Sequence, residues 1–387
     1  MTAATRASDR PLALFVAFGF ALSLGIATVA VPLLVLGSGF DAAVVGFLVA
    51  VSAATQLATR FALPWLLGRL PDRLLISVAG TFMFAGFVLF ASSALLPAFV
   101  AAQMAQGAAR AIFWTSSQTH AIRSGGSPVR RLVDLNLAGN AGTLTGPVLA
   151  GVLAGVGFTV PMLVAGVAVG LSAAGAVAMH RLPPYDRRRS AGSWQLMRRK
   201  GVDLALWTNV AGGVWWSIIG SYVPVILLGA GIVPALVGLL VTISEGSGAA
   251  ALLLLRRLRS DLVPRVLRTA AIVEMAMLVG IAFAPPLFAA YVTLLILGGV
   301  AAGCVTSLGP ALVALAATEH EQADGIALSG VFRSTAQLAA PALVGALLAV
   351  VSIPVAVAGI AVAIALPGAV LGRRPSTRER PATSVAP

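Results

Sequence analysis

Apolar segments of membrane-spanning length recur along the whole chain, from residue 11 to residue 372. An α-helix needs about 20 apolar residues to cross the hydrocarbon core of a bilayer, where its backbone must satisfy its own hydrogen bonds. The chain is therefore expected to be an all-α membrane protein. Twelve transmembrane helices are expected, at residues 11–36, 42–64, 74–94, 97–120, 134–156, 160–180, 203–228, 233–255, 266–284, 287–316, 326–350 and 354–372.

The composition excludes a soluble globular domain. Of the 387 residues, 59% are hydrophobic and only 10% are charged, whereas a soluble surface is about 25–35% charged. The single cysteine, Cys304, leaves no disulfide framework and no cysteine-based metal cluster to expect. His120, His180 and His320 fall at expected helix ends, so neither a metal site nor another cofactor is predicted. The first apolar run has no cleavage pattern, so we expect it to be a helix rather than a signal peptide.

One basic segment, residues 181–201, marks the only clear change in composition along the chain. It is expected to be a cytoplasmic linker. It would join an N-terminal six-helix bundle, residues 1–180, to a C-terminal six-helix bundle with a short cytoplasmic tail, residues 202–387.

The two bundles carry a weak internal repeat. Residues 136–155 align with residues 330–349, which pairs Pro147 with Pro341 and also pairs a glycine four residues later. Related halves joined by a linker are typical of transporters whose substrate site lies between the halves. We therefore expect two six-helix pseudo-repeats with a site at their interface.

Lysine and arginine occur on only one side of the expected helices. If residues 1–10 lie in the cytoplasm, the connectors on the opposite side contain Asp41 as their only charge. The positive-inside rule then predicts a multi-pass protein of the cell (inner) membrane with both termini cytoplasmic. The net charge of +13 is thus attributed to topology and anionic lipid, and no nucleic-acid partner is expected. The basic residues of the cytoplasmic connectors are Arg69, Arg73, Arg123, Arg130, Arg131, Arg187 to Arg189, Arg198 to Lys200 and those from Arg256 to Arg268.

Two short motifs stand at specific places in the N-terminal bundle. The connector after the second helix reads GRLPDR and contains Gly68, Asp72 and Arg73. The fifth helix contains Gly146 and Pro147 within a glycine-rich run. Together with twelve helices and a repeat, these motifs resemble those of the major facilitator superfamily (MFS), and the second is similar to its antiporter motif. The resemblance covers nearly the whole chain and implies a proton-coupled drug or metabolite efflux transporter.

The resemblance also implies an MFS fold and a gate. Helices 1, 2, 4, 5, 7, 8, 10 and 11 would line a central cavity, and the five motif residues would act in gating. Asp72 would form a latch with the helix that starts near Asp324, with a plain loop aspartate as the alternative. The chain departs from the family pattern at Gln103, where an arginine is usual, and it lacks the later glycine and basic pair of the loop motif.

Polar residues of the fourth helix fall on one helical face. They are Gln103, Gln106, Arg110, Trp114 and Ser117. A cation near mid-membrane is tolerated only beside a polar cavity or a partner. Arg110 is therefore expected to bind an anionic or polar substrate group or to pair with Glu245, and a purely structural ion pair is the alternative.

Further cavity residues are expected on helices 5, 7 and 11. Asn140 and Gln337 lie on repeat-related helices, and Trp215 and Trp216 lie mid-helix, where an interfacial aromatic belt does not fit. We expect these residues to contact substrate, although polar side chains can also simply bond neighbouring helices. Arg333 lies nearer the cytoplasmic end and is expected to contact lipid headgroups or to act in a gate.

Glu245 is a carboxylate near mid-membrane among small residues such as Ser244 and Gly246. Burial disfavours its charge, whereas a nearby Arg110 favours it, so a proton can bind and leave at this position. The expected role is proton coupling, and the alternative is a permanently neutral group that hydrogen-bonds across a helix interface. Glu274 lies on a helix that the resemblance places outside the cavity and is expected to be a packing group.

The leading expectation is a secondary transporter that exports a small organic molecule in exchange for protons. Its partners would be that substrate, protons and the lipid bilayer, and a monomer is expected. A mainly apolar, aromatic cavity would suit amphipathic molecules. A sugar or nutrient transporter of the same fold is the alternative. An enzyme is not expected, because the chain lacks an HExxH pair, a Ser/His/Asp set within one leaflet and a GxxxxGK[ST] loop.

Overall fold

The computed structural model describes residues 9–124, 128–184, 197, 201–255, 258–316 and 322–370. These residues form long helices and no strand, which confirms the all-α class. Most of the predicted linker lies outside them, as do Arg256 and His320. The elements are α2 (Asp9–Gly37), α3 (Ala42–Leu67), α4 (Asp72–Ser92), α5 (Leu96–Arg123), α6 (Pro128–Ala154), α7 (Val160–Ala178), α8 (Val202–Ile219), α9 (Tyr222–Gly229), α10 (Pro234–Leu255), the 3-10 turn η2 (Ser260–Leu262), α11 (Val263–Phe283), α12 (Phe288–Ala316), α13 (Gln322–Leu347) and α14 (Ile353–Val370).

The seventh expected helix, residues 203–228, is divided in the structure. α8 ends at Ile219, α9 begins at Tyr222, and the two axes differ by 46°. Pro224 explains the break, because proline lacks an N–H and its ring collides with the carbonyl four residues earlier, which here belongs to Gly220. The sequence pattern predicted one continuous span because both pieces are apolar.

Eight of the described helices are long and apolar enough to cross a membrane, and the bent pair α8 and α9 would be a ninth span. They are α2, α3, α4, α6, α7, α10, α11 and α12. The chain is therefore a multi-pass membrane protein. α5 is not among the eight, and it is the helix that carries the predicted polar face. The twelve-span topology remains a prediction.

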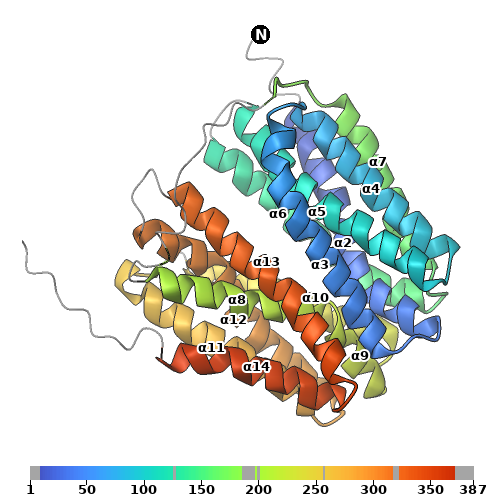
Figure 1. Cartoon of the computed structure of the whole chain (residues 1–387), viewed down its shortest axis with the longest axis vertical. Helices are drawn as coiled ribbons and strands as arrows, with labels where there is room; N and C mark the ends of the chain where they lie inside the picture. The colour runs from blue at the N-terminus through green and yellow to red at the C-terminus, as the bar shows by residue number, and fades with distance from the viewer. Residues whose placement is uncertain are drawn as a thin grey trace, which may run out of the picture.

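The helices pack in two groups, which Figure 1 shows in blue to green and in yellow-green to red. α2 to α7, here called the N-half, pack mainly on one another, and α8 to α14, the C-half, do the same. The main contacts between the halves join α3 to α13 and α6 to α10. These four helices therefore hold the two halves together.

At both inter-half contacts, a glycine lies against the backbone carbonyl of a proline inside the facing helix. A Cβ added at Gly46 of α3 would lie 2.7 Å from the carbonyl oxygen of Pro341 in α13. A Cβ added at Gly238 of α10 would overlap the carbonyl oxygen of Pro147 in α6. The sequence repeat pairs the same two prolines, so both contacts use one backbone arrangement. Small residues of this kind let helix backbones approach closely in lipid.

Both glycine–proline contacts lie at the same end of the bundle. They involve the N-terminal parts of α3 and α10 and the C-terminal parts of α6 and α13. The Tyr222 hydroxyl adds to one of them by donating a 3.2 Å hydrogen bond to the Pro341 carbonyl. Toward the other end, Arg60 of α3 donates a 3.3 Å hydrogen bond to the Gly330 carbonyl of α13. Backbone-to-backbone packing thus joins the halves at one end, and a side-chain contact joins them toward the other.

Replacing Gly238 by alanine should weaken the inter-half contact, because the added methyl group has no space beside the Pro147 carbonyl. Forced overpacking costs about 1–3 kcal/mol. Gly246→Ala in the same helix is the matched control, since its Cβ would make only an ordinary 3.6 Å contact with Leu144. Thermal unfolding of the purified variants in detergent should show a lower midpoint for Gly238→Ala alone. Equal midpoints for the two variants would contradict the assignment.

Candidate functional site

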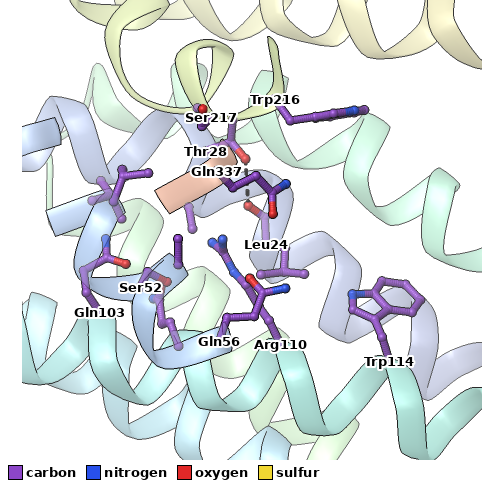
Figure 2. Close-up of a pocket in the computed structure, with 16 residues that line it drawn as sticks. Leu24, Thr28, Ser52, Gln56, Gln103, Arg110, Trp114, Trp216, Ser217 and Gln337 are labelled. Atoms are coloured by element: carbon purple, nitrogen blue, oxygen red, sulfur yellow. Dashed lines mark hydrogen bonds between the residues drawn. The ribbon is translucent and has the colours of Figure 1, made fainter. Parts of the chain in front are cut away.

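Two adjoining cavities lie between the N-half and the C-half. The larger has a volume of about 300 Å³ and is lined by α2, α3 and α5 from the N-half and by α8 and α13 from the C-half. Figure 2 shows side chains of both halves reaching into it. Six residues predicted for the substrate cavity line it: Gln103, Gln106, Arg110, Trp114, Trp216 and Gln337.

This first cavity is more polar than the sequence predicted. Half of its 16 lining residues carry a hydroxyl, an amide or a guanidinium group. The prediction of a mainly apolar, aromatic cavity missed the contribution of α2, α3 and the end of α8. The residues that it missed are Thr28, Ser52, Gln56 and Ser217. Ser52 and Gln56 stand four residues apart on α3, and this spacing could have indicated a polar face.

Arg110 has no hydrogen bond or ion pair within the described part of the chain, and its Nε is buried without a partner. Both amide atoms of Gln106 are buried without a partner as well. An unmade hydrogen bond of a buried polar group costs about 1–3 kcal/mol. Among the described residues, Arg110 forms no ion pair, so the expected ion pair with Glu245 is not present in this structure. These side chains are therefore free to bind a ligand.

The second cavity, of about 110 Å³, contains the remaining predicted residues. Glu245 lines it together with Asn140, Trp215 and Trp216. Trp216 lines both the Arg110 cavity and the Glu245 cavity, so the two spaces share this residue in their walls. Trp215 is 1% exposed and packs in the core as well. The predicted set is thus divided between two neighbouring spaces that share one wall.

The predicted gating residues lie in two different settings. Asp72 is buried at the start of α4 and accepts a 3.0 Å hydrogen bond from Arg123 of α5. Arg73 donates a 3.1 Å hydrogen bond to the carbonyl of Met179, directly after α7, and Gly68 lies in the exposed turn before α4. Asp72 is therefore bonded within the N-half. The side chain of Asp324, its predicted neighbour, lies outside the described residues, so the latch stays a prediction.

Gly146 and Pro147 of the second motif are packing positions in α6. A Cβ added at Gly146 would lie 2.5 Å from the backbone of Gly25 in α2. Pro147 presents its carbonyl to α10, as described above. The motif therefore joins α6 to α2 on one side and to the C-half on the other.

Two of the predicted cytoplasmic histidines meet at Asp9. His180 Nδ1 lies 2.8 Å from Asp9 Oδ1, and His120 Nε2 lies 3.5 Å from Asp9 Oδ2. Among the described residues, no group of three or more His, Cys, Asp or Glu side chains could hold a metal ion. The histidines therefore link the start of α2 to the ends of α5 and α7.

Arg333 and Glu274 lie inside the C-half. Arg333 donates a 2.8 Å hydrogen bond from Nη2 to Thr306 of α12, instead of reaching lipid headgroups as the sequence predicted. Glu274 of α11 is fully buried. The lipid-headgroup alternative for Arg333 is wrong, because the side chain turns toward α12. The gate alternative stays a prediction.

Polar cavities between two packed helical halves are an arrangement typical of membrane transporters. The chain belongs to the Major Facilitator Superfamily, whose family profile matches residues 13–259. A search of curated proteins gives no match.

Solved transporter structures share the fold. The nucleoside transporter NupG has a TM-score of 0.78 at 11% sequence identity, over 95% of this chain and 99% of that chain. A POT family transporter in complex with a thioalcohol-conjugated peptide has a TM-score of 0.75 at 10% identity, over 94% and 96% of the two chains. At these identities the likeness concerns the fold alone.

Replacing Arg110 by glutamine should raise the thermal unfolding midpoint of the substrate-free protein, or leave it unchanged. The reason is that the variant removes a cation that has no partner in the folded chain. Arg123→Gln is the matched control, because it removes a guanidinium bonded to Asp72, and its midpoint should fall. A comparable fall for both variants, measured in detergent, would show that Arg110 is a structural ion-pair residue.

Proposed function

We propose that this protein is a proton-coupled secondary transporter that moves a small polar organic molecule across the inner membrane by alternating access. The observation that carries the proposal is the pair of adjoining cavities, one with an unpartnered arginine and amides and the other with a carboxylate. Substrate and proton would then bind in neighbouring spaces. Export is the favoured direction, because the α6 motif resembles that of antiporters.

The chemistry of the first cavity supports a polar substrate. Four glutamines line it, Gln56, Gln103, Gln106 and Gln337, and each amide can both donate and accept. Arg110 adds a cation that suits a carboxylate or another anionic group. A volume of about 300 Å³ is at the lower end of ligand pockets. A small molecule with hydroxyl or amide groups and an acidic group fits these features.

A sugar or nutrient transporter is the second candidate. The four glutamines favour it, because amides bind hydroxyl groups without requiring a charge on the substrate. Two structural neighbours, a nucleoside transporter and a transporter in complex with a peptide, support polar cargo for this fold. An uncharged substrate would not need the positive charge of Arg110. In that case Arg110 would act in proton coupling or in gating.

The conformation agrees with alternating access. With the predicted orientation, the glycine–proline contacts lie at the external end, so the described state would be closed to the outside. In this state Asp72 pairs with Arg123 of its own half. Closure at the cytoplasmic end would require Asp72 to exchange that partner if it serves as the latch. The division into residues 1–180 and 202–387 joined by a cytoplasmic linker is part of this proposal.

Transport assays in inverted membrane vesicles test the function. Acidic sugars, amino acids and nucleosides should be screened with and without an imposed proton gradient. Gradient-driven accumulation of one class supports export, and accumulation that ignores the gradient contradicts proton coupling.

Glu245→Gln should abolish uphill transport but retain substrate binding, because glutamine keeps the hydrogen-bonding shape but cannot release a proton. The measurements are gradient-driven uptake into vesicles and substrate binding to the purified protein. Asp261→Asn, which removes an exposed carboxylate paired with Arg259, is the matched control and should transport normally. Full gradient-driven transport by Glu245→Gln would leave Glu245 only a structural role.

A cysteine at Ser38, in the connector between α2 and α3, should react with an impermeant thiol reagent from outside the cell. Arg69→Cys, in the connector between α3 and α4, should react only after the membrane is opened. Both are made after Cys304→Ser, which removes the single native cysteine. The reverse pattern would overturn the predicted orientation.

A further inference from the structure

Glu274 is a buried carboxylate that the proposed transport cycle does not yet use. It lies in the middle of α11 at 0% exposure, and neither of its oxygens has a hydrogen-bond partner in the described part of the chain. Removing a carboxylate from water costs several kcal/mol unless hydrogen bonds or an ion pair compensate. A packing role alone does not explain an acid at this position, since a leucine would fill the space without that cost.

Arg333 of α13 is the positive charge that acts on Glu274. No ion pair between them is present among the described residues, and the Arg333 Nε is buried without a partner. The Nη2 group donates to Thr306, which lines the second cavity beside Glu245. Arg333 therefore reaches the wall of this cavity through Thr306, whereas Glu274 lies buried behind it.

Arg60 places a second positive charge near Arg333, from the other half of the molecule. Its Nη1 donates to the carbonyl of Gly330, which lies one helical turn before Arg333 on α13. The charges of Arg60 and Arg333 repel each other. Because Arg60 belongs to the N-half and Arg333 to the C-half, this repulsion acts across the interface. It acts toward the end opposite the two glycine–proline contacts.

Within the described ranges, no other full charge is placed to balance Glu274 in place of Arg333. Cys304 of α12 interacts with Glu274 but is uncharged as a thiol. α14 has no ionisable residue in its described range. The other ionisable residues of the elements packed on α11, and of α11 itself, stand near the starts of their elements: Asp203, Asp261, Arg265, Arg268 and Tyr291.

We propose that Glu274 is a second proton-binding site, and that its charge sets, through Arg333, how closely the Arg60 ends of the two halves approach. When Glu274 is ionised, it balances Arg333, and Arg60 can rest against α13. When Glu274 takes one proton from water, the charge of Arg333 is unbalanced and repels Arg60. Protonation thus favours separation at this end, and no other bond changes. The proposal rests on alternating access as proposed above, but not on Glu245 or on the substrate.

Distances between spin labels test this inference without any substrate. Leu74 of α4 and Leu366 of α14 are 44% and 64% exposed and lie at the Arg60 end of the two halves. Both are replaced by labelled cysteines in a Cys304→Ser background, and pulsed EPR distances are measured from mildly acidic to mildly alkaline pH. The starting protein should shift from longer to shorter distances as the pH rises. Glu274→Gln should keep the longer distances at every pH.

Two further variants separate repulsion from misfolding. Arg60→Gln alters an exposed side chain and should keep the shorter distances at every pH. Combined with Glu274→Gln, it should restore the shorter distances. Glu245→Gln and Asp261→Asn should leave the pH-dependent shift intact.

The inference is overturned if Glu274→Gln retains the normal shift, or if Arg60→Gln does. A protein that fails every transport assay can still show this shift. A working transporter can equally lack it, so the two proposals fail separately.

Discussion

The close backbone approach between the two halves is the constraint on which the rest of the structure depends. Lipid offers helices no hydrophobic gain on association, so contact must come from tight packing and hydrogen bonds. Glycine against a proline carbonyl supplies that packing twice, in α3 with α13 and in α10 with α6. Because both contacts lie at one end, the polar cavities remain between the halves farther along the same helices.

Buried charges are the second organising feature. Arg110 and Glu274 are held without hydrogen-bond partners among the described residues, although each would be more stable in water or in an ion pair. Arg123 and Asp72, by contrast, form a close pair at the edge of the N-half. The charged pair at the edge of the N-half therefore joins two helices. The charged groups in and beside the cavities, by contrast, lack hydrogen-bond partners among the described residues.

The sequence predicted helix positions well, because a long apolar run has few alternatives in a bilayer. It also predicted the wall of the first cavity on α5, since a polar stripe at helical spacing can face only another polar surface. It missed Ser52 and Gln56, although their four-residue spacing places them on one face of α3, because the rest of that helix is mainly apolar. It did not predict where the Arg333 side chain points, because depth along a helix can be counted but the direction of a long side chain depends on neighbours such as Thr306. Pro224 could have indicated the helix break at Gly220. The prediction of one continuous helix followed the hydropathy, which stays high across the break.

Trp216 forms the wall shared by the two cavities. The Arg110 guanidinium lines the larger cavity and the Glu245 carboxylate lines the smaller one, and no ion pair joins them among the described residues. A ligand in either cavity would therefore contact the same indole ring. A substrate that displaced this ring would change the shape of both spaces at once.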